Sequence, residues 1–200
     1  FFKQKTAYEI YQCDWSSDVC SSDLGVYARN TVGGSISVIN SGDIFADTFG
    51  LYALTSGSAT AVTLNNSGDL TVGRTGLRAI SSGSTSVVDI TNSGTVTVDG
   101  TNANTSSMGV YAFTNNNVTV HNDGDIVVTT NDTNLVQGVR VFANNGYAAV
   151  YSAGDITLNR SNAGANTHAI NILDADLGAR VVADGDLVVH TSGQNFAAIN

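Results

Sequence analysis

The chain has 200 residues, a formal net charge of −9 at pH 7, a hydrophobic fraction of 42% and no proline. This hydrophobic fraction suffices for one domain with a core, so the composition excludes a disordered chain. The negative charge argues against binding to nucleic acid and to anionic lipid. No apolar run reaches the ~20 residues that a membrane helix needs.

The first 24 residues differ in composition from the rest, because they hold both cysteines, the one tryptophan, both lysines and the one glutamate. Their segments KQKTAYEI and DWSSDVCSSDL can be read as translated DNA that resembles the adapter of a short-read sequencing library. We therefore predict that 1–24 is an adapter-derived artefact outside the fold. The alternative is a small N-terminal segment with a disulfide between Cys13 and Cys20.

From Gly25 onward the chain repeats, with a turn that recurs every 26 to 31 residues. The turn reads INSGDI, NNSGDL, TNSGTV, HNDGDI, YSAGDI and VADGDL, and the units open on a second landmark such as GVYA, GLYA or GLRA. Self-similarity at this period is typical of solenoid proteins.

Aliphatic and polar residues alternate on both sides of each turn, which is the period of a β-strand with one buried face. The predicted inward positions nearest the turn are Val38, Leu64, Ile90, Val120, Val150 and Val181 before it, and Ile44, Leu70, Val96, Ile126, Ile156 and Leu187 after it. Equivalent positions stack where each unit forms one coil. We predict an all-β fold over 25–200, a parallel β-helix of about six coils with three short strands each.

The GVYA…NSGDI units resemble the right-handed parallel β-helix of bacterial autotransporter passenger domains and related haemagglutinin-like adhesins, over 25–200. The resemblance implies a fragment of a larger passenger that is secreted or displayed on the bacterial cell surface. It also implies association with the outer membrane, with a signal peptide and a membrane barrel outside this fragment. The same backbone serves polysaccharide lyases and pectinases, so a carbohydrate-active enzyme is the alternative.

Aspartates follow the turn glycine in five of six units, at Asp43, Asp69, Asp125, Asp155 and Asp186, with Thr95 in the sixth. Stacked carboxylates would lie ~4.8 Å apart, close to the ~5–5.5 Å of retaining glycosidases. An active site needs one differentiated pair, however, whereas this column recurs. We therefore expect these side chains to bond turn amides, with calcium binding as the alternative.

A second turn column consists of Asn40, Asn66, Asn92 and Asn122. Stacked side-chain amides can hydrogen-bond from one coil to the next, as in other in-register parallel arrays. We predict a structural ladder that Ser152 and Ala183 interrupt, and a looser structure at that end.

The outward position of the first strand reads Tyr27, Tyr52, Arg78, Tyr111 and Arg140. Tyrosine and arginine dominate interface hot spots, so this face is the candidate contact for a host or surface glycan or protein. The alternative is cross-strand stacking with cation–π support. Longer loops at 99–107, 129–137 and 159–167 form a second candidate surface.

The sequence predicts neither a metal site nor a cofactor. His121, His168 and His190 occupy non-equivalent positions without a second ligand at metal-binding spacing. No phosphate loop, GxSxG, HExxH or Cys/His pair follows the first 24 residues. These observations favour a non-enzymatic passenger or stalk that serves adhesion or surface presentation, and a pure spacer is a third hypothesis.

Overall fold

The computed structural model describes residues 23–56, 61–100, 106–131, 134–162, 166–193 and 195–200. These ranges contain 19 β-strands and no α-helix, so none of the described chain is a helix with the length and apolar character of a membrane span. The segment 1–22, with both cysteines, lies outside the described residues. So do the centres of the three long loops, at 101–105, 132–133 and 163–165.

The strands form three parallel sheets, A, B and C. Sheet A contains β1 (Leu24–Asn30), β4 (Phe49–Thr55), β7 (Thr75–Ser81), β10 (Ser107–Thr114), β13 (Val136–Ala143), β16 (Thr167–Leu173) and β19 (Phe196–Ile199). Sheet B contains β2 (Ile36–Asn40), β5 (Ala61–Asn66), β8 (Val87–Asn92), β11 (Val118–Asn122), β14 (Ala148–Ser152) and β17 (Ala179–Ala183). Sheet C contains β3 (Ile44–Ala46), β6 (Leu70–Val72), β9 (Val96–Gly100), β12 (Ile126–Thr130), β15 (Ile156–Arg160) and β18 (Leu187–Thr191).

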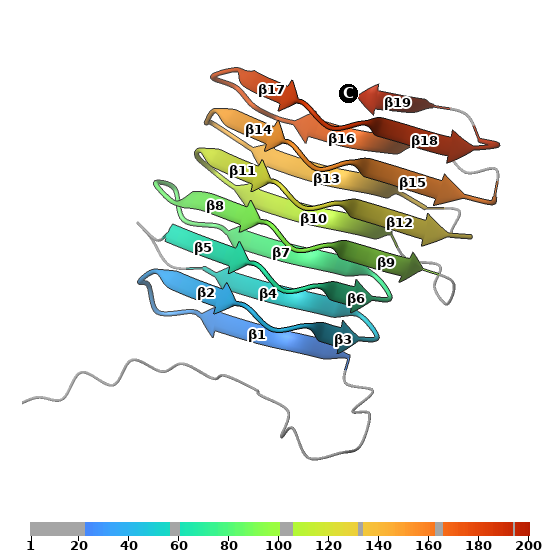
Figure 1. The fold of residues 1–200 in the computed structure, drawn as a ribbon. Helices are drawn as coiled ribbons and strands as arrows, with labels where there is room; N and C mark the ends of the chain where they lie inside the picture. The colour runs from blue at the N-terminus through green and yellow to red at the C-terminus, as the bar shows by residue number, and fades with distance from the viewer. Residues whose placement is uncertain (1–22, 57–60, 101–105, 132–133, 163–165, 194) are drawn as a thin grey trace, which may run out of the picture.

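Each successive triplet of strands makes one coil of a β-solenoid, and the described residues contain six such triplets followed by β19. Every strand pairs in parallel with the equivalent strand of the next coil, as β4 does with β7. Followed upward from β1 in Figure 1, the chain winds as a right-handed coil with sheet A behind sheets B and C. The predicted all-β solenoid of three-stranded coils is confirmed.

The first described strand begins at Leu24, one residue before the first landmark glycine, Gly25. Leu24 opens β1 and pairs in register with Phe49. The carbonyl of Asp23 also accepts the backbone amide of Phe49 at 3.0 Å. Main-chain pairing to the second coil therefore includes Leu24 in the first strand.

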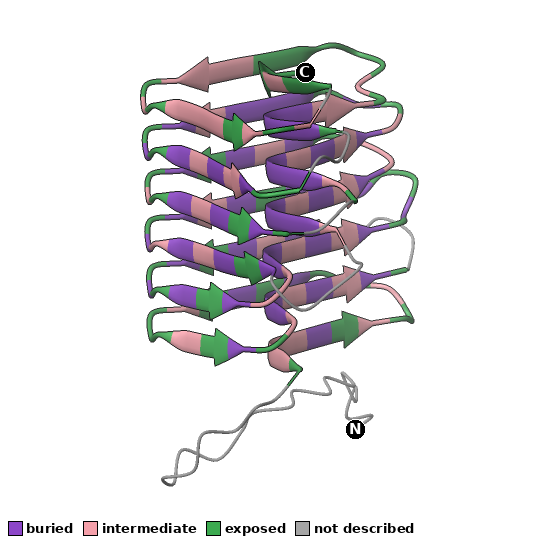
Figure 2. Cartoon of the chain, turned by 90° about the vertical axis from the view of Figure 1, so that its right-hand side faces the viewer, coloured by how far each residue is buried: buried purple, intermediate pink, exposed green. Residues whose placement is uncertain are grey.

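The core consists of columns of aliphatic side chains inside the coils. Leu64 pairs in register with Ile90, and Val120 with Val150, and all four are fully buried. Figure 2 shows the buried positions alternating along the strands and stacking from coil to coil. Parallel sheets normally need covering helices, but here the inner faces of the three sheets cover one another.

Burial decreases in β17 and β18, where no further strand of sheet B or C lies above in the described chain. Val181 and Leu187 are partly buried, and Ala179 is exposed. The inward pattern is the same as in the central coils, so the difference comes from a missing neighbour rather than from a different register.

The glycine of the GVYA-type landmark is required by packing between sheets A and C. A Cβ added at Gly76 would collide with the side chain of Val96 in sheet C, and it would lie 2.8 Å from the carbonyl oxygen of Gly109. Val96 is fully buried against this backbone. The landmark therefore marks the point where sheet C packs directly onto the main chain of sheet A.

The alternation predicts that the same substitution has a large effect on stability at one position and a small effect at the adjacent position. Val120 is fully buried and Thr119 is partly exposed on the outer face of sheet B. Val120→Asp would bury an unpaired charge, and we expect a loss of about 3–5 kcal/mol in the free energy of unfolding. Thr119→Asp would lie beside Asp89 in register, and we expect a loss below about 1 kcal/mol. Urea unfolding followed by circular dichroism measures both, and similar losses would contradict the inward and outward assignment.

Candidate functional site

The outer face of sheet A carries the candidate contact residues in one continuous column. Tyr27, Tyr52, Arg78, Tyr111 and Arg140 are successive partners in the parallel register of β1, β4, β7, β10 and β13. All five side chains are partly exposed. We call these five residues the sheet A strip. The register extends the column to Asn171 in β16, which the sequence analysis missed and which is buried.

Aromatic rings hold Arg78 from several sides. Its guanidinium carbon lies 4.9 Å from the ring centroid of Tyr52, 5.3 Å from that of Tyr111 and 5.1 Å from that of Phe49. Tyr27 and Tyr52 are in ring contact at 5.0 Å. Cross-strand stacking with cation–π support is therefore present within the strip, and it orders side chains that also face solvent.

Further aromatic and basic residues flank the strip and were missed by the sequence analysis. The guanidinium of Arg140 lies 4.8 Å from the ring centroid of Phe142, and the ring of Phe142 is 6.0 Å from that of Phe113. Arg74 lies over Phe49 at 5.3 Å. Two sequence signals could have identified these aromatic residues. The alternation places Phe113 and Phe142 on the same face as the strip, two residues after Tyr111 and Arg140. Phe49 directly precedes a landmark glycine.

The charge of sheet A is opposite to that of the whole protein. The seven sheet A strands contain no aspartate or glutamate, although the chain has 17 acidic residues. Burial raises the pKa of the Tyr111 phenol, against the opposing effect of the Arg140 and Arg78 cations. Burial also lowers the pKa of the Arg140 guanidinium, and the nearby Tyr111 partly offsets this effect. The outer face of this sheet is therefore cationic and aromatic.

His168 lies on β16, three residues before Asn171, and pairs in register with Gln137. It is 7% exposed, and its Nδ1 lies 3.5 Å from Nε2 of Gln137. Burial lowers the pKa of His168, and the nearby Arg140 cation lowers it further. Both effects disfavour the imidazolium form, so His168 is neutral in the folded protein near neutral pH.

A ladder of asparagine side chains runs along the corner between sheets B and C. Nδ2 of Asn40, Asn66 and Asn92 donates to Oδ1 of the next asparagine at 2.8, 2.9 and 2.8 Å. The same nitrogen also donates to a glycine carbonyl two residues on, as Asn66 does to Gly68 at 2.7 Å. Asn66, Asn92 and Asn122 are fully buried, so these bonds satisfy the amides where water is absent.

The ladder continues one step beyond the predicted interruption. Nδ2 of Asn122 donates to the Ser152 hydroxyl at 3.1 Å, and that hydroxyl donates to the carbonyl of Gly154 at 3.1 Å. The prediction that Ser152 breaks the ladder is wrong, because a hydroxyl can accept from one coil and donate within its own turn. Ala183, paired with Ser152, has no side-chain donor or acceptor and ends the ladder.

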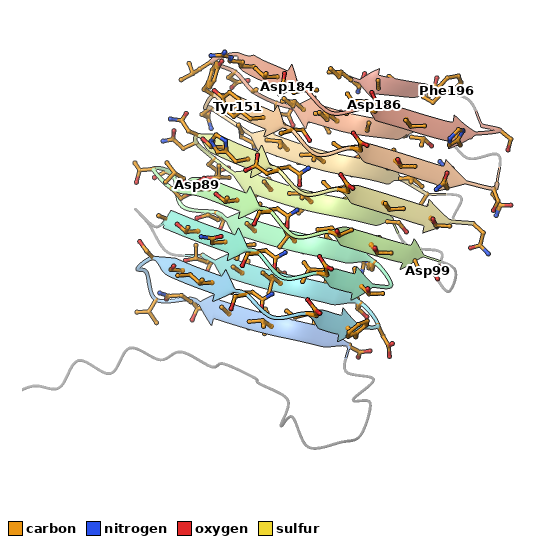
Figure 3. All side chains as sticks on the ribbon, viewed as in Figure 1. Asp89, Asp99, Tyr151, Asp184, Asp186 and Phe196 are labelled. Carbon is orange, nitrogen blue, oxygen red and sulfur yellow. The ribbon has the colours of Figure 1, made fainter. Side chains whose placement is uncertain are left out.

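The turn aspartates bind backbone amides of the neighbouring coil. Oδ1 of Asp43 accepts from the amide of Asp69 at 3.0 Å, and Oδ1 of Asp69 accepts from the amide of Thr95 at 2.8 Å. Asp125 and Asp155 repeat this contact with the amides of Asp155 and Asp186 at 3.0 and 2.8 Å. The carboxylates therefore link successive coils, and Figure 3 shows Asp186 at this corner, between β17 and β18.

The remaining histidines lie apart from each other. The ring of His121 is stacked on that of Tyr151 in sheet B at 4.7 Å, and His190 is exposed on sheet C. Within the described ranges, no group of three or more histidine, cysteine, aspartate or glutamate side chains is placed to hold a metal ion.

Comparisons with known proteins identify no relative. No protein-family model matches the chain, and no curated protein or solved structure matches it significantly. The resemblance to autotransporter passengers therefore rests on the repeat residues alone.

The ladder generates a prediction about stability. Asn92→Ala removes two donated bonds and one accepted bond at a fully buried position. We expect a loss of about 2–4 kcal/mol in the free energy of unfolding, because buried partners are left unsatisfied. Asn65→Ala, on the exposed face of the same sheet, is the control and should change it by less than about 0.5 kcal/mol. Equal effects in urea unfolding would contradict a stabilising role for the ladder.

His168 generates a prediction about pH. Its folded pKa lies below the unfolded value of about 6.5, so below that pH the unfolded chain binds more protons than the folded chain. Stability contributed by neutral His168 is therefore lost as the pH falls through about 6.5 toward the folded pKa. We expect the fall in Tm from about pH 7.5 to about pH 5.5 to be smaller in His168→Gln than in the unmodified chain. An unchanged fall in His168→Gln, or an equal reduction in His190→Gln, would contradict this assignment.

Proposed function

We propose that the chain is a non-enzymatic β-solenoid passenger, secreted or displayed on the bacterial cell surface, which presents sheet A for adhesion to a glycan or protein. The observation that supports this function is the sheet A strip, in which tyrosine and arginine side chains occupy one outward column over five consecutive coils. Both residue types contribute strongly to binding at interfaces.

The use of the acidic side chains favours binding over catalysis. The aspartates that recur at the turn accept amide hydrogen bonds from the next coil, and successive carboxylates make the same contact. General acid–base chemistry requires two groups whose environments differ, so that one donates and the other accepts a proton. A repeating structural contact supports the non-enzymatic reading.

Adhesion can be tested with beads that carry the full chain. We expect such beads to be retained on at least one surface from a panel of polymeric glycans and extracellular proteins. A Tyr52→Ala/Tyr111→Ala variant should reduce retention about tenfold or more, because it removes two aromatic members of the strip. Tyr151→Ala removes a partly exposed tyrosine from sheet B and is the matched control.

Two outcomes would contradict this proposal. Absence of retention on every surface, or equal loss in the strip variant and the Tyr151→Ala control, would remove the adhesive role of sheet A. Release of reducing or unsaturated ends from any of the glycans by the soluble chain would show an enzyme instead. Circular dichroism and Tm must show that the compared variants are folded.

A further inference from the structure

We propose that the sheet A strip binds linear polysaccharides that carry a carboxylate or sulfate on alternate sugars. This inference rests on the proposed function and adds the chemical class of the ligand. Three independent properties of the strip lead to it: the order of its residues, the fixed orientation of its arginines and the sign of its charge.

Aromatic and cationic side chains alternate over the last four residues of the strip. Tyr52, Arg78, Tyr111 and Arg140 are direct neighbours in register, so the two arginines are separated by two coil spacings, or ~10 Å. This separation is comparable with that between anionic groups in a polysaccharide with one such group per disaccharide. Tyr111, between the arginines, offers an aromatic surface to the apolar face of the intervening neutral sugar.

The two arginines are oriented before a ligand arrives. Arg78 lies over the rings of Tyr52 and Tyr111, and Arg140 lies over Phe142. The Nε atoms of Arg78 and Arg140 are buried without a hydrogen-bond partner, so hydrogen bonding toward solvent is left to their terminal nitrogens. A planar guanidinium fork matches carboxylates and similar oxyanions, and its prior immobilisation reduces the entropy lost on binding.

Charge complementarity favours an acidic polymer on this face of the solenoid. The sheet A strands contain no acidic residue, while exposed aspartates such as Asp43, Asp69 and Asp155 lie along the corner between sheets B and C. Figure 3 shows Asp184 and Asp186 at that corner in the sixth coil. A polyanion is therefore attracted to sheet A and repelled from the corner, which fixes the face it contacts.

The acidic corner of a second copy is the other occupant that charge alone allows. Its carboxylates already accept amide bonds from the next coil, as Asp43 does from Asp69 and Asp155 does from Asp186. The strip is also one residue wide and runs along the solenoid axis, which suits a narrow extended polymer. We therefore argue for the polysaccharide and include self-association as an outcome of the test.

The test measures binding of the full 200-residue chain to immobilised hyaluronan and unsulfated chondroitin, with dextran as the neutral polymer. We expect binding to the two anionic polymers, weakened by salt, and at least about tenfold less to dextran. Arg78→Gln/Arg140→Gln should reduce binding to hyaluronan about tenfold or more, because charge-assisted hydrogen bonds are lost.

Two further variants separate a specific site from general charge. Arg180→Gln removes one arginine charge from sheet B, where the guanidinium carbon of Arg180 lies 5.5 Å from the ring centroid of Tyr151, and should change binding less than about twofold. Arg78→Lys/Arg140→Lys keeps the charge without the planar fork, so we expect a loss between those of the glutamine variant and the unmodified chain. Tm and circular dichroism establish that each variant is folded.

Every outcome of these measurements is decisive. Equal binding to dextran, or equal losses in Arg180→Gln and the strip variant, would overturn the assignment to anionic polysaccharide. If the beads are retained on a neutral glycan or a protein through Tyr52 and Tyr111, this inference fails while the adhesive function stands. If sedimentation shows salt-sensitive self-association that the arginine variant abolishes, without polysaccharide binding, the partner is a second copy and the inference is wrong. If nothing binds, both proposals fail.

Discussion

The in-register parallel pairing of successive coils is the constraint on which the structure depends. Because the interstrand spacing is ~4.8 Å, each side chain meets the equivalent residue of the next coil, whichever way it points. Inside, this condition favours aliphatic columns such as Leu64, Ile90 and Val120. Outside, it makes any repeated residue type into a linear array, so a face can acquire one chemical character along the whole solenoid.

The corner between sheets B and C enforces this register more strictly than the strands do. Buried asparagine amides and exposed aspartate carboxylates both bridge coils there, on either side of the turn backbone. A Cβ added at Gly68 would collide with the carbonyl of Gly42, so the turns also stack directly main chain on main chain. Slippage of one coil would break all three contacts together, whereas sheet pairing alone tolerates alternative registers more easily.

Residues within one column could be predicted from the repeat, and contacts between columns could not. The period placed Ile90 and Val120 inside and aligned Asn66 with Asn92, because these assignments need only the equivalent position in the next unit. The stacking of Arg78 on Phe49 and the contact of Gln137 with His168 depend on where a long side chain turns, which the period leaves open. The prediction for Ser152 was wrong because it considered only that serine is not asparagine. Whether the ladder continues depends instead on hydrogen-bonding capacity, and the Ser152 hydroxyl can both accept and donate.

The contrast between the corner and sheet A argues against a pure spacer. A spacer needs only stacked coils. The corner and the aliphatic columns already stabilise this stacking, and they place no restriction on the outward positions of sheet A. Yet these strands exclude acidic residues in a chain with 17 of them, while they hold Arg78 and Arg140 beside aromatic rings. Clustered like charges reduce stability unless something offsets them. Stability of the coils alone therefore does not require this composition, whereas the proposed binding of an oppositely charged partner would account for it.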